Sequence, residues 1–118
     1  ARRRAVTIAT RIVFDVPSMI DAGEVRHVTL NLLINAVRMA KSGGSVQLSV
    51  QSTRQELEIV VDDDGPGWPP AETMETGDGL GLSAVRATLG RLSGTIALER
   101  SPLGGARARI HIPTGHAA

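Results

Sequence analysis

The sequence predicts an α+β fold, a two-layer α/β sandwich in which two helices cover one face of a sheet. The first observation is the order of the expected elements, which is strand, helix, hairpin, loop, helix, hairpin. The second is that a hairpin pairs its strands in an antiparallel sense. The third is size, because 118 residues with 42% hydrophobic side chains are enough for one domain with a buried core.

The first part of the chain contains a strand region and a long helix. Residues 5–16 are rich in β-branched side chains and are expected to form one or two short strands, which Pro17 ends. Asp21–Lys41 consists largely of strong helix formers, and Gly43 and Gly44 mark the end of this helix.

Two hairpins, a loop and a second helix follow. Ser45–Ser52 and Gln55–Asp63 alternate polar and apolar residues, so we expect them to pair as a hairpin. Residues 65–78 are rich in Pro, Gly, Thr and Glu, which is typical of a loop. Leu80–Leu92 is predicted to be the second helix, ended by Gly94. The last two strands, joined by the turn sequence SPLGG, are expected at Thr95–Arg100 and Ala106–Ile112.

Composition narrows the function classes. A formal net charge of +1 gives no argument for a nucleic-acid or membrane surface. The absence of cysteine excludes disulfides, thiol chemistry and zinc held by thiolates. No apolar run reaches membrane-spanning length and no signal peptide is visible. We therefore expect a single cytoplasmic domain over residues 1–118, with residues 1–4 and 114–118 as linker or tail.

A narrow polar stripe interrupts the apolar long helix. His27, Asn31, Asn35 and Arg38 are three or four residues apart, so they share one helix face. A solvent-facing stripe is one interpretation. Against it, asparagine is a poor helix former, and neutral amide oxygens suit a hydrated hard cation such as Mg²⁺. The stripe alone leaves both interpretations open.

Three consecutive aspartates, Asp62, Asp63 and Asp64, close the second strand of the first hairpin. Period-2 alternation gives that strand an apolar face that ends in Asp63. A buried ionised carboxylate requires hydrogen-bond donors, whereas Asp62 and Asp64 can point to solvent. The following turn, residues 65–67, has two glycines that allow a close approach of the backbone to a ligand.

A calcium loop is the rival interpretation of these aspartates. Its spacing would require an acid at position 60 and a glutamate at position 71. The chain has Val60 and Ala71 there, and the preceding element is a strand. We therefore give the calcium loop little weight.

The stretch GDGLGLS, residues 77–83, opens the second helix. Gly79 and Gly81 free the backbone to approach a ligand, and a helix start offers unpaired N–H groups to an anion. A flexible entry loop is the alternative. The pattern is neither a Walker loop nor G-x-G-x-x-G, because Leu82 occupies the last glycine position.

Taken together, these stretches resemble the ATP-binding domain of sensor histidine kinases, in the superfamily shared with gyrase, Hsp90 and MutL. NLLINAVRMA at 31–40 is similar to the asparagine box of that family, and DDGPG at 63–67 matches its first glycine box, D-x-G-x-G. GDGLGLSAV at 77–85 resembles the second glycine box. The resemblance covers nearly the whole chain and implies the Bergerat fold, a mixed, mostly antiparallel sheet with helices on one face.

The resemblance implies that the chain binds ATP and Mg²⁺. Asn35 would coordinate the Mg²⁺ that bridges the phosphates, and Asn31 would support that site. Arg38 stands where the family often has a lysine that reaches the phosphates. Asp63 would accept a hydrogen bond from the adenine amino group.

The glycines would let the backbone lie close to the nucleotide. Gly65 and Gly67 would let the loop pass the base, and Gly79 and Gly81 would present N–H groups to the phosphates. The nucleotide-binding residues implied by the resemblance are Asn31, Asn35, Arg38, Met39, Asp63, Gly65, Gly67, Gly77, Gly79, Leu80, Gly81 and Leu82, with Asn35 as the metal ligand.

The chain departs from the family pattern in its lid. Between Gly67 and Gly77 there is only WPPAETMET, without a phenylalanine-rich box, and residues 55–85 contain no Lys or Arg. Met39 stands where an aromatic residue often packs on adenine. The phosphate charge would then be met by Mg²⁺, Arg38 and backbone donors.

The resemblance implies a protein histidine kinase that transfers the γ-phosphoryl group of ATP to a histidine on a separate dimerisation domain. A response regulator would be an indirect partner. His27, His111 and His116 lack a phosphoacceptor-like context, so we expect that histidine outside this chain. Two alternatives stay open: a serine kinase of the anti-sigma-factor type, and a non-catalytic module that binds nucleotide or a partner.

Overall fold

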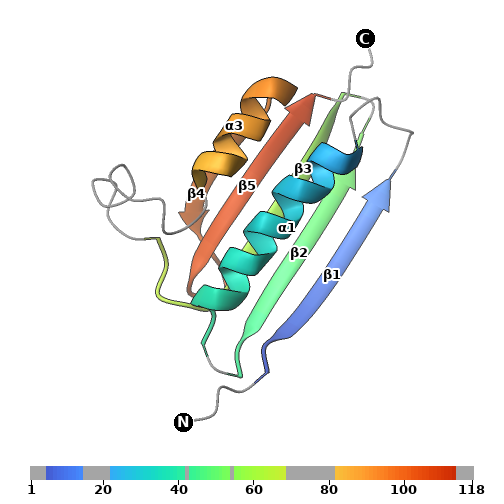
Figure 1. The fold of residues 1–118 in the computed structure, drawn as a ribbon. Coiled ribbons are helices and arrows are strands. Elements are labelled where there is room, and N and C mark those ends of the chain that lie inside the picture. Colours follow the sequence, from blue (N-terminus) through green and yellow to red (C-terminus); the bar gives the residue numbers. More distant parts are fainter. Residues whose placement is uncertain (1–4, 15–21, 42, 54, 69–81, 114–118) are drawn as a thin grey trace.

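The computed structural model describes residues 5–14, 22–41, 43–53, 55–68 and 82–113, and Figure 1 shows their arrangement as a sheet with helices on one side. The helices are α1 (Ala22–Met39) and α3 (Leu82–Leu92). The strands are β1 (Thr7–Phe14), β2 (Ser45–Ser52), β3 (Glu56–Asp63), β4 (Thr95–Arg100) and β5 (Ala106–Pro113). The predicted order of elements is confirmed, and the first strand region forms one strand.

The five strands form one mixed sheet in the order β1-β2-β3-β5-β4. β1 pairs with β2 in a parallel sense, and every other neighbouring pair is antiparallel. Two of the antiparallel pairs are the predicted hairpins, whereas β3 and β5 come together across 42 intervening residues, Asp64 to Gly105. This central pair brings the end of β3 beside the start of β5, which is where the candidate site lies.

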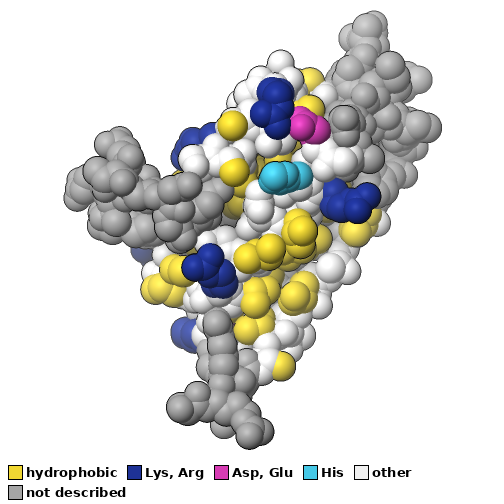
Figure 2. All heavy atoms as spheres, in the orientation of Figure 1, with side chains coloured by type: hydrophobic (Ala, Val, Ile, Leu, Met, Phe, Trp, Pro, Cys, Tyr) yellow, Lys and Arg dark blue, Asp and Glu magenta, His cyan; other side chains and the backbone are white. Residues whose placement is uncertain are grey.

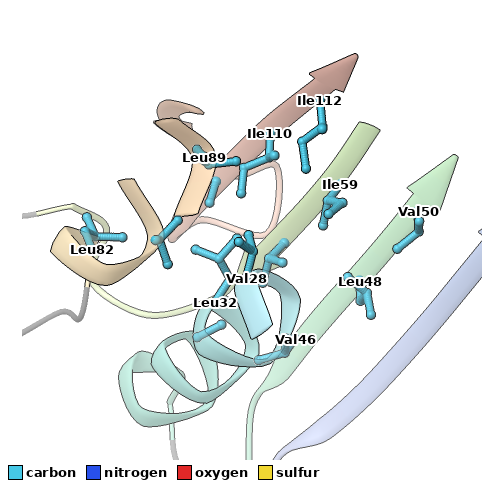
Figure 3. Close-up of a cluster of buried hydrophobic side chains, with 14 of the residues drawn as sticks. Val28, Leu32, Val46, Leu48, Val50, Ile59, Leu82, Leu89, Ile110 and Ile112 are labelled. Atoms are coloured by element: carbon cyan, nitrogen blue, oxygen red, sulfur yellow. The ribbon is translucent and has the colours of Figure 1, made fainter. Parts of the chain in front are cut away.

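The hydrophobic core fills the space between the helices and the sheet (Figure 3). Ile59 of β3 lies opposite Ile110 of β5, and both are fully buried. Val28 of α1 and Leu89 of α3 pack onto this pair from the helical layer. Because the chain is poor in aromatic residues, branched aliphatic side chains supply most of the buried apolar area and hence most of the driving force for folding.

Helix α1 is more exposed than its apolar composition predicts. Leu30 and Ile34, one turn apart on α1, are 52% and 48% exposed, and Ile8 and Ile12 on the edge strand are similarly exposed. One helix is about 10 Å wide and covers roughly two strands, so two helices leave part of a five-stranded sheet uncovered. Figure 2 shows hydrophobic side chains gathered on the surface of this helical face.

The opposite face of the sheet is polar. Glu58 accepts a hydrogen bond from Arg109 at 3.2 Å and lies 2.8 Å from Nε2 of His111, and Arg109 also donates to Glu99 at 3.2 Å. Burial raises the pKa of Glu58, but the hydrogen bonds from His111 and Arg109 outweigh it and lower that pKa overall. This face is therefore held by a network of ion pairs across three strands.

Helix α3 ends at Leu92 as predicted, but the left-handed residue of its cap is Ser93 rather than Gly94. Ser93 takes the left-handed conformation, with φ of 57°. The N–H of Gly94 donates to the carbonyl of Leu89 at 2.8 Å, and the N–H of Ser93 to that of Gly90 at 3.4 Å, which is the pattern of a Schellman cap. A Cβ at Gly94 would be too close to the side chains of Leu89 and Ile112, so close packing favours glycine at this position.

Replacing Ser93 with glycine should stabilise the domain. Left-handed strain in a non-glycine residue costs roughly 1–2 kcal/mol, and the added freedom of the unfolded chain offsets about 0.4–1 kcal/mol of that gain. We expect Ser93→Gly to raise the free energy of unfolding by about 0.5–1 kcal/mol in urea denaturation. Ser93→Ala keeps the Cβ and should therefore not raise the free energy of unfolding. If the glycine variant is no more stable than the alanine variant, the left-handed conformation of Ser93 is not strained.

Candidate functional site

The candidate site centres on Asp63, the last residue of β3. This residue is only 3% exposed. Oδ1 accepts hydrogen bonds from the N–H of Gly65 at 2.9 Å and from the N–H of Ala106 at 3.1 Å. The sequence argument required donors for this buried carboxylate, and the protein backbone supplies two. Both bonds use Oδ1, so neither occupies Oδ2.

Asp62 does not point freely to solvent as the sequence suggested. Its carboxylate is buried and forms a two-pronged ion pair with Arg107 of β5, at 2.7 Å and 3.1 Å. The hydrogen bond to Asp62 raises the pKa of Arg107. Alternation places Asp62 on the polar face of the sheet, where the neighbouring strand supplies a cation.

Asp64 is also bound to the protein, which corrects the second half of that expectation. Its Oδ1 accepts a hydrogen bond from the N–H of Lys41 at 3.0 Å, and its Oδ2 accepts one from the N–H of Ser45 at 3.0 Å. Lys41 follows the end of α1 and Ser45 begins β2. The three aspartates therefore have three different environments, and their charges do not share one pocket.

Three glycines let the backbone close around these carboxylates. A Cβ at Gly65 would overlap the carbonyl oxygen of Met39, the last residue of α1, and a Cβ at Gly105 would overlap Oδ1 of Asp63. Gly44 faces the carboxylate of Asp64 in the same way. The resemblance implies that Gly65 lets the loop pass the base, and in the structure Gly65 also lies close to the end of α1.

Gly67 and Trp68 continue the turn after β3. Gly67 has a positive φ of 89°, which favours glycine. The indole N–H of Trp68 donates to the carbonyl of Arg107 at 3.0 Å, and its ring packs against the core. Trp68 and Gly105 are residues that the sequence analysis did not assign to the site, because only the pairing of β3 with β5 brings their partners close.

Burial of the polar stripe on α1 increases from His27 to Asn35, and the stripe is exposed again at Arg38. His27 and Arg38 are exposed, Asn31 is half-buried and Asn35 is 7% exposed. In the part of the chain that the structure describes, no fully enclosed side-chain polar atom lacks a hydrogen bond. Asn35 is buried but not completely enclosed.

The other predicted site residues divide into two groups. Leu82 is buried in the hydrophobic core at the start of α3, and Met39 is half-buried at the end of α1. The remaining positions of the second glycine box, Gly77, Gly79, Leu80 and Gly81, lie outside the described residues. The described part of the site is thus the end of β3 together with the last turns of α1.

A metal held only by acidic or histidine side chains finds no support in the described residues. No cluster of three or more His, Asp or Glu side chains that could hold an ion occurs among residues 5–14, 22–41, 43–53, 55–68 and 82–113. A single amide oxygen at Asn35 fits the alternative, in which the cation takes most of its oxygen ligands from phosphates and water. None of the helices in the described ranges is long and apolar enough to cross a membrane.

Residues 20–116 match the family described as histidine kinase-, DNA gyrase B- and HSP90-like ATPase. The chain belongs to this ATPase family. Membership in this ATPase family implies that the domain binds ATP.

Similar curated proteins are sensor kinases. The chain is 40% identical over 98 residues to the sensor-type histidine kinase PrrB of Mycobacterium tuberculosis H37Rv, an alignment that covers 70% of this chain and 21% of PrrB. It is 30% identical over 129 aligned positions to the sensor protein PhoQ of Escherichia coli K12, which covers 99% of this chain and 26% of PhoQ. The chain thus spans about a fifth to a quarter of the length of these relatives.

Solved structures agree with the family. The ATP-binding domain of PrrB from Mycobacterium tuberculosis superposes with a TM-score of 0.69 at 34% identity, over 91% of this chain and 80% of that one. The mycobacterial sensor histidine kinase MprB gives a TM-score of 0.73 at 24% identity, over 92% of this chain and 81% of that one. The MprB likeness shows the fold, and the PrrB likeness supports both the fold and the family.

The contact between Gly65 and α1 can be tested by adding one methyl group. Because the Cβ would overlap the backbone oxygen of Met39, Gly65→Ala should lower the free energy of unfolding by more than about 2 kcal/mol. Gly90→Ala is the matched control, since nothing lies within 4 Å of that added carbon and alanine favours a helix by up to about 1 kcal/mol. Equal stabilities of the two variants in urea denaturation would refute the close contact.

Proposed function

We propose that this domain binds Mg²⁺–ATP and presents its γ-phosphoryl group to a histidine on a separate dimerisation domain, as in a two-component sensor histidine kinase. The observation that carries the proposal is Asp63, a buried carboxylate with Oδ1 held by two backbone N–H groups and Oδ2 outside those bonds. Family membership and the sensor-kinase relatives support the same function.

Asp63 is the proposed recognition group for adenine. An amino group is a hydrogen-bond donor, and a carboxylate is an acceptor only. Because Oδ1 is fixed by Gly65 and Ala106, the direction of Oδ2 is fixed before the nucleotide arrives. Such preorganisation reduces the entropy lost on binding.

The polar face of α1 is the proposed phosphate side of the site. Asn35 would hold the cation through its amide oxygen, with Asn31 one turn away in support, and the Arg38 guanidinium would lie toward the phosphates. Bound Mg²⁺ supplies neutralisation of the phosphate charge. The chain's own contribution is to bind and orient the nucleotide, since Asp, Asn and Arg here act without covalent chemistry.

Because this chain binds and orients the nucleotide, the proposed partners are the proteins or domains that receive the phosphoryl group. The accepting histidine would lie on a dimerisation domain elsewhere in the same protein or on another chain, and a response regulator would receive the phosphoryl group afterwards. We propose a cytoplasmic location for this domain, with no direct contact to nucleic acid or membrane.

A non-catalytic nucleotide-binding role is the second candidate function. The short lid without Lys or Arg is the feature that favours it. Mg²⁺–ATP-dependent phosphorylation of the whole protein separates the kinase from the non-catalytic module.

Asp63→Asn tests the adenine contact without removing the local fold. The asparagine Oδ1 can still accept from Gly65 and Ala106, whereas a donating amide replaces Oδ2. The asparagine amide and the adenine amino group, both donors, would then face each other. We therefore expect the affinity for Mg²⁺–ADP to fall about 10- to 100-fold, the equivalent of roughly 1.5–3 kcal/mol. Calorimetric titration of the folded variant and of the parent measures this loss of affinity.

Two results would count against this proposal. Binding within twofold of the parent by the folded Asp63→Asn variant would remove Asp63 from adenine recognition. Failure of the folded parent to bind either Mg²⁺–ADP or Mg²⁺–ATP would reject the nucleotide site in this chain and favour a partner-binding role.

A further inference from the structure

The carboxylate of Asp64 joins three elements of the structure. It lies one residue beyond the end of β3, accepts the N–H of Lys41 just after α1 through Oδ1, and accepts the N–H of Ser45 at the start of β2 through Oδ2, both at 3.0 Å. A carboxylate can accept from two donors with two different oxygens, whereas an asparagine side chain has one oxygen. The chemistry of this bridge therefore requires an aspartate.

The bridge leaves little freedom around it. Gly44 faces the Asp64 carboxylate so closely that a Cβ there would overlap it, and Gly65 faces the carbonyl of Met39 in the same way. The turn after β3 thus rests directly on the last residue of α1. A longer acid at position 64 would need space that the backbone at Gly44 occupies.

A negative charge at this place carries an electrostatic cost. Asp64 lies beside the C-terminal end of α1, where the helix dipole disfavours anions. The adjacent Asp63 is a second carboxylate, so like charges add to the cost. The two N–H donors offset this cost and fix the geometry at the same time.

We propose that Asp64 is a positioning residue that sets the spacing between the two halves of the nucleotide site. Asn35 lies one turn before the end of α1, and Asp63 precedes Asp64 directly, so the bridge connects the proposed metal side to the proposed adenine side. This inference rests on the proposed function. Its consequence is that Asp64 affects a ligand that contacts both halves and spares a ligand that contacts only the adenine half.

The test compares two ligands on the 118-residue chain. Mg²⁺–ADP spans both halves, and adenosine reaches only the Asp63 half. We expect Asp64→Asn to weaken Mg²⁺–ADP about 5- to 20-fold and Asp64→Ala to weaken it further, because a small misplacement of paired groups is costly in affinity. Adenosine binding, followed by NMR titration, should change by no more than about twofold in the same variants.

Asp62→Asn is the matched control. It removes a charge from the neighbouring residue and weakens the pair with Arg107, which lies on the opposite face of the sheet. We expect it to leave both affinities within about twofold of the parent, at a temperature where circular dichroism shows every variant folded. If Asp64→Ala does not fold, Asp64→Asn decides, because it keeps one of the two acceptors.

The outcomes are distinct. Loss of Mg²⁺–ADP affinity with adenosine retained supports the positioning role. Equal loss of both ligands, no loss of either, or an equal effect of Asp62→Asn would overturn it. A folded parent that binds no Mg²⁺–ADP would reject the proposed function itself.

Discussion

The two backbone N–H groups that hold Oδ1 of Asp63 are the constraint on which the rest of the site depends. One donor, Gly65, follows in the same turn, and the other, Ala106, begins β5. A buried carboxylate without them would be costly. With them, the carboxylate joins the ends of the two central strands, and the turn that carries the first glycine box is fixed against the sheet.

Asp62 and Asp63 face opposite sides of the sheet because a strand alternates its faces, and Asp64 lies one residue beyond the end of the strand. Asp62 pairs with Arg107 on the polar face, Asp63 is buried at the edge of the core, and Asp64 reaches back to the end of α1. Each charge is met by a different set of donors. Three adjacent aspartates are therefore compatible with a folded domain, and the run ties the sheet to the helix beside the proposed nucleotide.

Local sequence patterns predicted much of this structure. Helix formers, alternation and turn residues gave the element order, and alternation correctly placed Asp63 on the core face. Apart from Gly65, two residues after Asp63, the partners of the aspartates could not be predicted, because they lie 19 to 45 residues away along the chain. Only the pairing of β3 with β5 and the α1–β2 connection bring them close. The exposure of Leu30 and Ile34 likewise depends on how many strands two helices can cover. Ser93 at the end of α3 was missed because glycine is the usual left-handed cap.

The central claim is that the end of β3 and the last turns of α1 together form one nucleotide site. A crystal structure of the chain with ADP and Mg²⁺ tests it most directly. The account predicts the adenine amino group within hydrogen-bond distance of Oδ2 of Asp63 and the cation on the amide oxygen of Asn35. Nucleotide bound on the polar face of the sheet, beside Arg107 and Arg109, or adenine bound without contact to Asp63, would contradict it.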